Sequence, residues 1–171
     1  MTRPLRAGPI RSFPLMPLEL DATDLRILAQ LQRDSALSNQ ALAEAVHVSP
    51  ATALRRVRRL VEGGVIERQV ALLAPDTLGA GVLTAIVEVT LEAQSATAIE
   101  SFEAVVRAEP AVQQCYRVSS GPDFVLVVAT PDMAAYHALA GRLSAPAAGV
   151  RNVRTYFSVK RVKFGTELPL P

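Results

Sequence analysis

The residues with the clearest chemical potential are four arginines in the segment SPATALRRVRRL, residues 49–60. Arg55, Arg56, Arg58 and Arg59 fall within about two helical turns, and no acidic residue lies among them. Like charges at this spacing repel one another unless an anion neutralises them. A guanidinium group donates paired hydrogen bonds to phosphate oxygens and to the edge of guanine. The segment therefore predicts a surface for nucleic acid, with a solvated amphipathic helix as the alternative.

Other chemistries lack the residues that they need. The sequence contains no nucleophile-elbow, zinc-protease, phosphate-loop or dinucleotide-binding motif, and its carboxylates form no acid/base pair. Cys115 is the only cysteine, which excludes an internal disulfide and fits a reducing cytoplasm. We expect Cys115 to be a small buried residue of a strand. We expect no catalytic residue, no metal and no cofactor.

Three short helices must position the arginines. Asp21 and Ser38 are good N-caps for helices over 21–33 and 39–46. Ser49 followed by proline begins a third helix, which runs to about residue 62 and ends at a Gly-Gly pair. The apolar and β-branched residues 65–74 then predict a strand or hairpin wing. This order is typical of a winged helix-turn-helix.

The third helix has a core stripe and an outward face. Apolar residues recur at spacings of three and four, and we expect all of them inside: Ala53, Leu54, Val57, Leu60 and Val61. Arg55, Arg58 and Arg59 then point outward, while Arg56 at the flank either contacts DNA or braces the fold. Base edges should meet the start of the helix, and phosphates should meet the caps and later arginines. The predicted DNA-binding residues are Ser38, Asn39, Ser49, Pro50, Ala51, Thr52, Arg55, Arg56, Arg58 and Arg59.

The second half of the chain predicts a different architecture. Strands are expected over 82–91, 111–120, 123–130 and 150–162, with helices over 95–110 and 132–144. The order βαββαβ is that of a ferredoxin-like sandwich, so the whole chain is predicted to be α+β. The predicted domains are a disordered basic tail (1–17), a helix-turn-helix domain (18–64), a wing and linker strand (65–81), the sandwich (82–163) and a loose C-terminal tail (164–171).

Composition limits the broad class of protein. Half of the residues are apolar, so the chain can bury a sizeable core, and no apolar run is long enough for a transmembrane helix. The net charge is +2, and outside the basic tail the chain is close to neutral. A polyanion site must therefore come from local clustering. We expect a cytoplasmic protein.

Five motifs in one order resemble the Lrp/AsnC, or feast/famine, transcriptional regulators. They are LDATDLRILAQLQRDSALSNQALAEAVHVSPATALRRVRRLVEGGVI, ALLAPDTLG, CYRVSSGPDFVLVV, PDMAAYHAL and GVRNVRTYFSVKRVK. The resemblance implies that the sandwich is a RAM domain, which pairs sheet to sheet into a homodimer. It also implies a nucleoid-associated bacterial protein whose dimers assemble into octamers or similar rings on double-stranded DNA. A small effector, typically an amino acid, is implied between RAM domains of neighbouring dimers.

The resemblance further implies an effector loop after the second RAM strand. The family pattern Gly-Asp-x-Asp-Tyr is altered here: Ser120 and Gly121 replace its first two residues, while Asp123 and Phe124 match its last two. A structural turn or a different ligand therefore remains an alternative. The implied effector-binding residues are Ser119, Ser120, Gly121, Asp123 and Phe124, with Met133, Thr155, Tyr156 and Phe157 as secondary candidates. A core or dimer-interface role is the alternative for the secondary set.

One further departure from the family pattern lies in the turn of the helix-turn-helix. His47 stands where the family has glycine in the helix-turn-helix turn, and histidine tolerates positive φ better than β-branched residues do.

Competing functions are a DNA-architectural protein without an effector and an enzyme resembling the sirohaem decarboxylases. For the enzyme, His137 is the only histidine outside the DNA-binding domain, and a helical surface or core role suits it better.

Overall fold

The computed structural model describes residues 18–77, 81–145 and 148–171. The chain divides into two compact units, one containing residues 18–72 with Lys163–Pro171 and the other formed by Leu73–Val162. The predicted disordered tail, residues 1–17, lies outside the described residues. None of the described helices is long and apolar enough to cross a membrane.

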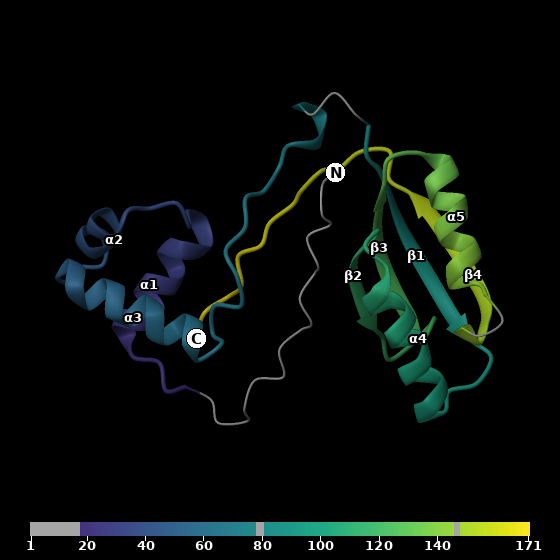
Figure 1. Ribbon diagram of the computed structural model, residues 1–171, viewed down its shortest axis with the longest axis horizontal. Helices are drawn as coiled ribbons and strands as arrows, with labels where there is room; N and C mark the ends of the chain where they lie inside the picture. Colours follow the sequence, from purple (N-terminus) through teal and green to yellow (C-terminus); the bar gives the residue numbers. More distant parts are fainter. Residues whose placement is uncertain (1–17, 78–80, 146–147) are drawn as a thin grey trace, which may run out of the picture. The chain divides into compact units, whose positions relative to one another are not determined.

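The first unit is built from three helices (Figure 1): α1 (Ala22–Arg33), α2 (Asn39–Ala45) and α3 (Pro50–Glu62). Asp21 caps α1 in a reciprocal capping box with Asp24, and the hydroxyls of Ser38 and Ser49 cap α2 and α3. These caps satisfy backbone N–H groups that have no partner inside a helix. The predicted helix starts are therefore confirmed within one residue.

The core of this unit lies among the three helices. Its buried side chains are Ile27, Leu28, Leu42, Val46 and Leu60. Leu170 packs against the same cluster, and the Gln32 side chain forms two hydrogen bonds with the Leu168 backbone. The C-terminal segment is thus attached to α1, unlike the loose end that we expected.

Two local expectations about the first unit have clear outcomes. His47 has φ of 59°, which confirms that histidine occupies a left-handed position between α2 and α3. Residues 65–74 form no strand, so that prediction is wrong for this chain. A strand needs a partner for its backbone groups, and within the described chain none pairs with this segment. Its apolar side chains are exposed instead, including Val70, Leu72 and Leu73.

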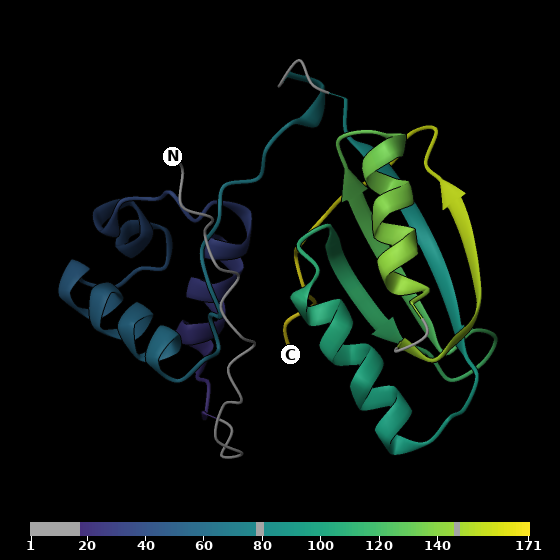
Figure 2. The same cartoon turned by 45° about the vertical axis from the view of Figure 1, so that its right-hand side comes forward.

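The second unit has the predicted βαββαβ order. Its elements are β1 (Leu83–Leu91), α4 (Ala96–Ala108), β2 (Val112–Arg117), β3 (Phe124–Thr130), α5 (Met133–Leu143) and β4 (Val150–Phe157). The antiparallel sheet has the order β2-β3-β1-β4, and Figure 2 shows α4 and α5 on the same face. The ferredoxin-like prediction is confirmed, although β4 ends at Phe157 and not at residue 162.

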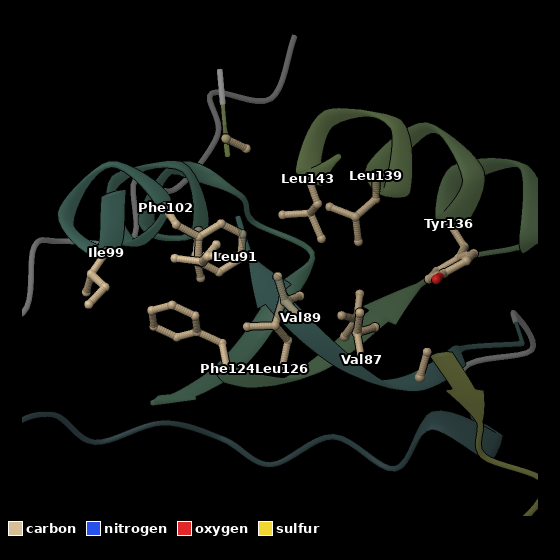
Figure 3. Packing of buried hydrophobic residues seen from close by; sticks show 14 residues of the cluster. Val87, Val89, Leu91, Ile99, Phe102, Phe124, Leu126, Tyr136, Leu139 and Leu143 are labelled. Carbon is tan, nitrogen blue, oxygen red and sulfur yellow. The ribbon is translucent and has the colours of Figure 1, made fainter. Parts of the chain in front are cut away.

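Alternation along the strands separates the core from an open face. Figure 3 shows Val87, Val89 and Leu126 pointing from the sheet toward the two helices, where Phe102 and Leu139 meet them. The opposite face of the sheet carries exposed apolar side chains, namely Ile86, Tyr116 and Tyr156. Cys115 is exposed, so the expectation that it is buried is wrong; β2 is an edge strand that the helices cover incompletely.

Candidate DNA interface and effector site

The caps of the helix-turn-helix also fix its turn. The Ser49 hydroxyl accepts a hydrogen bond from the Thr52 N–H at 3.2 Å and lies 2.9 Å from the Thr52 hydroxyl. The Asn39 side-chain amide donates to the carbonyl of Pro50 at 2.8 Å. Asn39 therefore links α2 to the start of α3, while Ser38 caps α2 and Ser49 with Thr52 caps α3. Whether any of them also contacts DNA remains a prediction.

A buried carboxylate lies at the centre of the arginine cluster. Asp24 of α1 is 0% exposed, and its Oδ1 accepts a hydrogen bond from Arg56 at 2.9 Å. Its Oδ2 accepts one from the Asp21 N–H at 3.1 Å and another from Arg59. Arg56 also pairs with the Asp21 carboxylate at 2.7 Å. Two of the four arginines thus bind α1 within the domain.

Helical phase accounts for the order of these contacts. At about 100° per residue, the order around α3, starting from the flank next to α1, is Arg56, Arg59, Arg55 and Arg58, at intervals of about 60°, 40° and 60°. Arg59, which we expected to point outward, pairs with Asp24 and keeps a side chain that is 40% exposed, and the bracing role considered for Arg56 is what its contacts indicate. The Arg56 Nε is buried and has no hydrogen-bond partner among the described residues.

The ion pairs shift the ionisation of their members. Hydrogen bonds from the Asp24 N–H and from the Arg56 side chain lower the pKa of Asp21 from its ordinary 3.8 to about 2. Hydrogen bonds to Asp21 and Asp24 raise the pKa of Arg56 above its usual value. Both effects favour the charged forms, so this contact between α1 and α3 is ionic at neutral pH.

Arg55 and Arg58 differ from the other two arginines. Both are exposed, and neither side chain has an ion pair or hydrogen bond within the described part of the chain. They border a shallow depression of about 480 Å³ on the outer side of α3. Its lining residues are Ala51, Leu54, Arg55, Arg58, Arg59 and Glu62. Exposed Pro50 lies at the first position of the same helix, and all of these residues are available to a large ligand.

Leu54 is a second correction on α3. We expected it in the core together with Val61, but the two side chains belong to residues that are 42% and 46% exposed. Ala53 and Leu60 are fully buried, and Val57 is partly buried. The core stripe is narrower than the sequence suggested, because about 100° of rotation takes Leu54 beyond the contact with α1 and α2.

The predicted effector loop borders a cavity of about 510 Å³ in the second unit. The cavity is lined by Gln94, Ile99, Arg117, Val118, Ser119, Ser120, Gly121, Pro122 and Asp123. Gly121 bends the loop with φ of 86°, a conformation that side chains with a Cβ rarely adopt. The structure therefore brings four predicted residues to one cavity: Ser119, Ser120, Gly121 and Asp123.

Asp123 is already engaged by its own chain. One carboxylate oxygen accepts a hydrogen bond from the Leu91 N–H at 2.7 Å, and the other accepts one from the Gln94 side chain at 2.9 Å. Its backbone N–H donates to Val89, and its carbonyl accepts from Val118. Asp123 thus closes the loop onto the end of β1. Each oxygen retains a lone pair that a ligand ammonium group can use.

Sequence reasoning missed two polar residues of this cavity, Gln94 and Arg117. Arg117 is exposed at the end of β2, and its side chain has no ion pair or hydrogen bond to any described residue. Its position at the last residue of the strand before the loop was a usable signal. Gln94 gave no such signal, since only the fold brings the segment before α4 to Asp123.

The remaining effector candidates lie elsewhere. Phe124 is buried and packs on Phe102 with ring centroids 4.8 Å apart, so it belongs to the core. Thr155 shares a hydrogen bond with Tyr136 of α5, and Phe157 packs edge-on against the same ring. Met133 at the start of α5 and Tyr156 are exposed.

Strand register separates these residues from the loop. Phe157 pairs with Ala85 of β1, whereas Asp123 bonds to Val89 and Leu91. Six residues of strand span about 20 Å, so the two sets lie at opposite ends of the sheet. One chain by itself does not gather all nine candidates into one pocket.

Comparison with known proteins shows the family. Residues 84–168 match the Lrp/AsnC ligand-binding domain, and residues 20–67 match a winged helix-turn-helix DNA-binding domain. The leucine-responsive regulatory protein of Salmonella typhimurium is 39% identical over 150 residues, covering 88% of this chain and 91% of that protein. The chain belongs to the Lrp/AsnC family. The Escherichia coli K12 protein of the same name is 38% identical over the same shares of both chains.

Solved structures of Lrp/AsnC regulators agree. A transcriptional regulator from Neisseria meningitidis in complex with L-Met has a TM-score of 0.76 and 33% identity, covering 88% of this chain and 97% of that one. An AsnC family regulator from Agrobacterium tumefaciens has a TM-score of 0.77 and 36% identity over the same shares. The protein is a transcriptional regulator that joins a DNA-binding helix-turn-helix to a ligand-binding domain.

Proposed function

We propose that α3 binds duplex DNA through Arg55 and Arg58, and that Arg56 and Arg59 hold the helix in place. The observation that carries this proposal is the pair of exposed arginines without a partner among the described residues, beside two that are bound to buried Asp24. A free guanidinium can neutralise a phosphate or bind guanine without first breaking an ion pair. The capped start of α3 suits entry into the major groove.

The salt dependence of binding tests this assignment. Arg58→Met should lower affinity for all duplexes and reduce the slope of log K against log salt by about one, as expected for one lost phosphate contact. Arg151→Met, at an exposed arginine on β4, is the matched control and should leave the slope unchanged. An unchanged slope for Arg58→Met would contradict the proposed interface.

We also propose that the open sheet face mediates homodimerisation. Exposed Ile86, Tyr116 and Tyr156 lie on this face, with the partly buried Val125 and Val127 beside them. Glu88 and Arg154 lie on the same face, so the apolar side chains form a local cluster, and an exposed apolar cluster rimmed by polar residues marks a protein-interaction site. Ile86→Glu should convert the dimer, or a larger assembly, to monomer in sedimentation velocity. Leu72→Glu, at a more exposed apolar position off the sheet, is the control.

For the effector, we propose an amino acid bound in the cavity beside the loop. Arg117, which has no ion pair with the residues that the structure describes, supplies a cation for the α-carboxylate, and the remaining lone pairs of Asp123 suit the ammonium group. Hydroxyls of Ser119 and Ser120 offer further hydrogen bonds. This arrangement supports a ligand with both charges, which neither the DNA-architectural alternative nor a porphyrin-like substrate requires. We infer a cytoplasmic regulator without catalytic activity.

Thermal stability tests the effector proposal. Each of the twenty L-amino acids is added to the purified protein, and a ligand that binds the folded state must raise its melting temperature. The active amino acid should lose its effect when its carboxylate is removed, and Arg117→Gln should abolish the response. Arg151→Gln should retain it. If no amino acid raises the melting temperature, the effector proposal fails and the architectural alternative gains support.

A further inference from the structure

Leu54 is an apolar side chain on the outward face of α3. The residue is 42% exposed, although it follows fully buried Ala53. Around the helix axis it lies about 60° from Ala51 and about 40° from Arg58, since each residue rotates by about 100°. It therefore belongs to the same face as the arginines that have no partner.

The surroundings of Leu54 favour a polyanion as the occupant of this face. Arg58 is its neighbour one turn later and Arg55 follows it directly; both are exposed cations without a partner among the described residues. Together with Ala51 they border the depression of about 480 Å³. The positive charge next to Leu54 complements DNA better than it complements the apolar surface of another protein.

Base edges in the major groove offer one apolar group, the C5-methyl of thymine. Leu54 is the fifth of the 13 residues of α3, in the half of a recognition helix that approaches base edges. We propose that Leu54 packs on a thymine methyl and so gives the regulator a preference for thymine at one position of each half-site. This inference rests on the proposed binding of DNA by α3.

Replacement of thymine by deoxyuridine tests the contact, because it removes the methyl and keeps every hydrogen-bonding group. A bound sequence is first selected from random duplexes with the full-length wild-type protein. Each thymine of that sequence is then replaced singly, and affinity is measured at fixed salt. Wild type should lose about fourfold at one position per half-site, as expected for one buried methyl group. Leu54→Ala should bind the thymine and deoxyuridine duplexes equally well at that position.

Val61→Ala is the matched control. Val61 is 46% exposed on the same helix but lies seven residues later, about 10 Å along the axis. This variant should keep the wild-type sensitivity to deoxyuridine. Circular dichroism should show that all three proteins are equally helical.

Two results would overturn the inference. In one, no single deoxyuridine replacement lowers the affinity of the wild-type protein for DNA. In the other, Leu54→Ala still loses the full wild-type factor in affinity when deoxyuridine replaces thymine at the sensitive position. The second result is also expected if Leu54 instead contacts a second copy of the chain. In that case Leu54→Ala would lower the affinity for the thymine and deoxyuridine duplexes by the same factor. Failure of wild type to select any sequence would contradict DNA reading by α3 itself, and is thereby distinguished from failure of the Leu54 contact.

Discussion

Replacement of Arg56 separates bracing from DNA reading within one helix. Arg56→Met keeps the aliphatic part of the side chain and removes the guanidinium that donates to Asp24 Oδ1 at 2.9 Å. That oxygen is fully buried and would lose its only donor among the described residues, while Arg59 and the Asp21 N–H would still donate to the other oxygen. An unsatisfied buried acceptor costs about 1–3 kcal/mol.

The expected loss of unfolding free energy is large for a unit of this size. For a small domain, about 1 kcal/mol corresponds to roughly 4–8 °C in melting temperature, so the first unit should unfold well below the wild-type temperature. Arg58→Met is the control, because an exposed side chain without a partner changes stability by less than about 0.5 kcal/mol. In contrast, Arg58→Met should weaken DNA binding, whereas Arg56→Met should bind normally at temperatures where it is folded.

The two units can be followed separately. Hydrogen exchange measured by mass spectrometry reports on α1 and α3, whose amides should lose protection in Arg56→Met. All three tyrosines of the sequence, Tyr116, Tyr136 and Tyr156, lie in the second unit, so tyrosine fluorescence should report an unchanged transition there. The bracing role would be refuted if Arg56→Met kept full protection in α1 while reducing the salt slope of DNA binding.

Three further predictions concern the first unit. Because the folded-state pKa of Asp21 is lowered to about 2, its contribution to stability is complete above about pH 4 and is lost as pH falls toward 2; acid titration of helicity should show this loss in wild type and a weaker one in Asp21→Asn. Leu60→Ala should cost about 2–5 kcal/mol in urea unfolding, because Leu60 is 0% exposed, and a cost equal to that of Leu54→Ala would contradict the corrected core stripe. His47→Val should destabilise the first unit by about 1–2 kcal/mol, since a β-branched residue resists a φ of 59°, and His47→Gly should not; equal melting temperatures for the two variants would argue against strain at this turn.

Much of the fold could be predicted from local sequence signals. Capping by Asp21, Ser38 and Ser49 depends on side chains and backbone within three residues, so the starts of the three helices could be predicted from the sequence. The βαββαβ order could also be predicted, because strand alternation and helical spacing are properties of short segments. The strand predicted over residues 65–74 is absent because strand formation also depends on a partner that the segment itself does not specify.

The candidate site divides in the same way. The sequence alone determined that four arginines share a helix and that Asp123 follows a loop between two strands. Only the tertiary structure decided that Asp24, more than thirty residues away, binds Arg56 and Arg59 and leaves Arg55 and Arg58 without a partner in the described part of the chain. It likewise brought Gln94 to Asp123 and exposed Leu54. Helical period and capping are local, whereas the partner of a charge and the width of a core stripe depend on which distant elements pack against that helix.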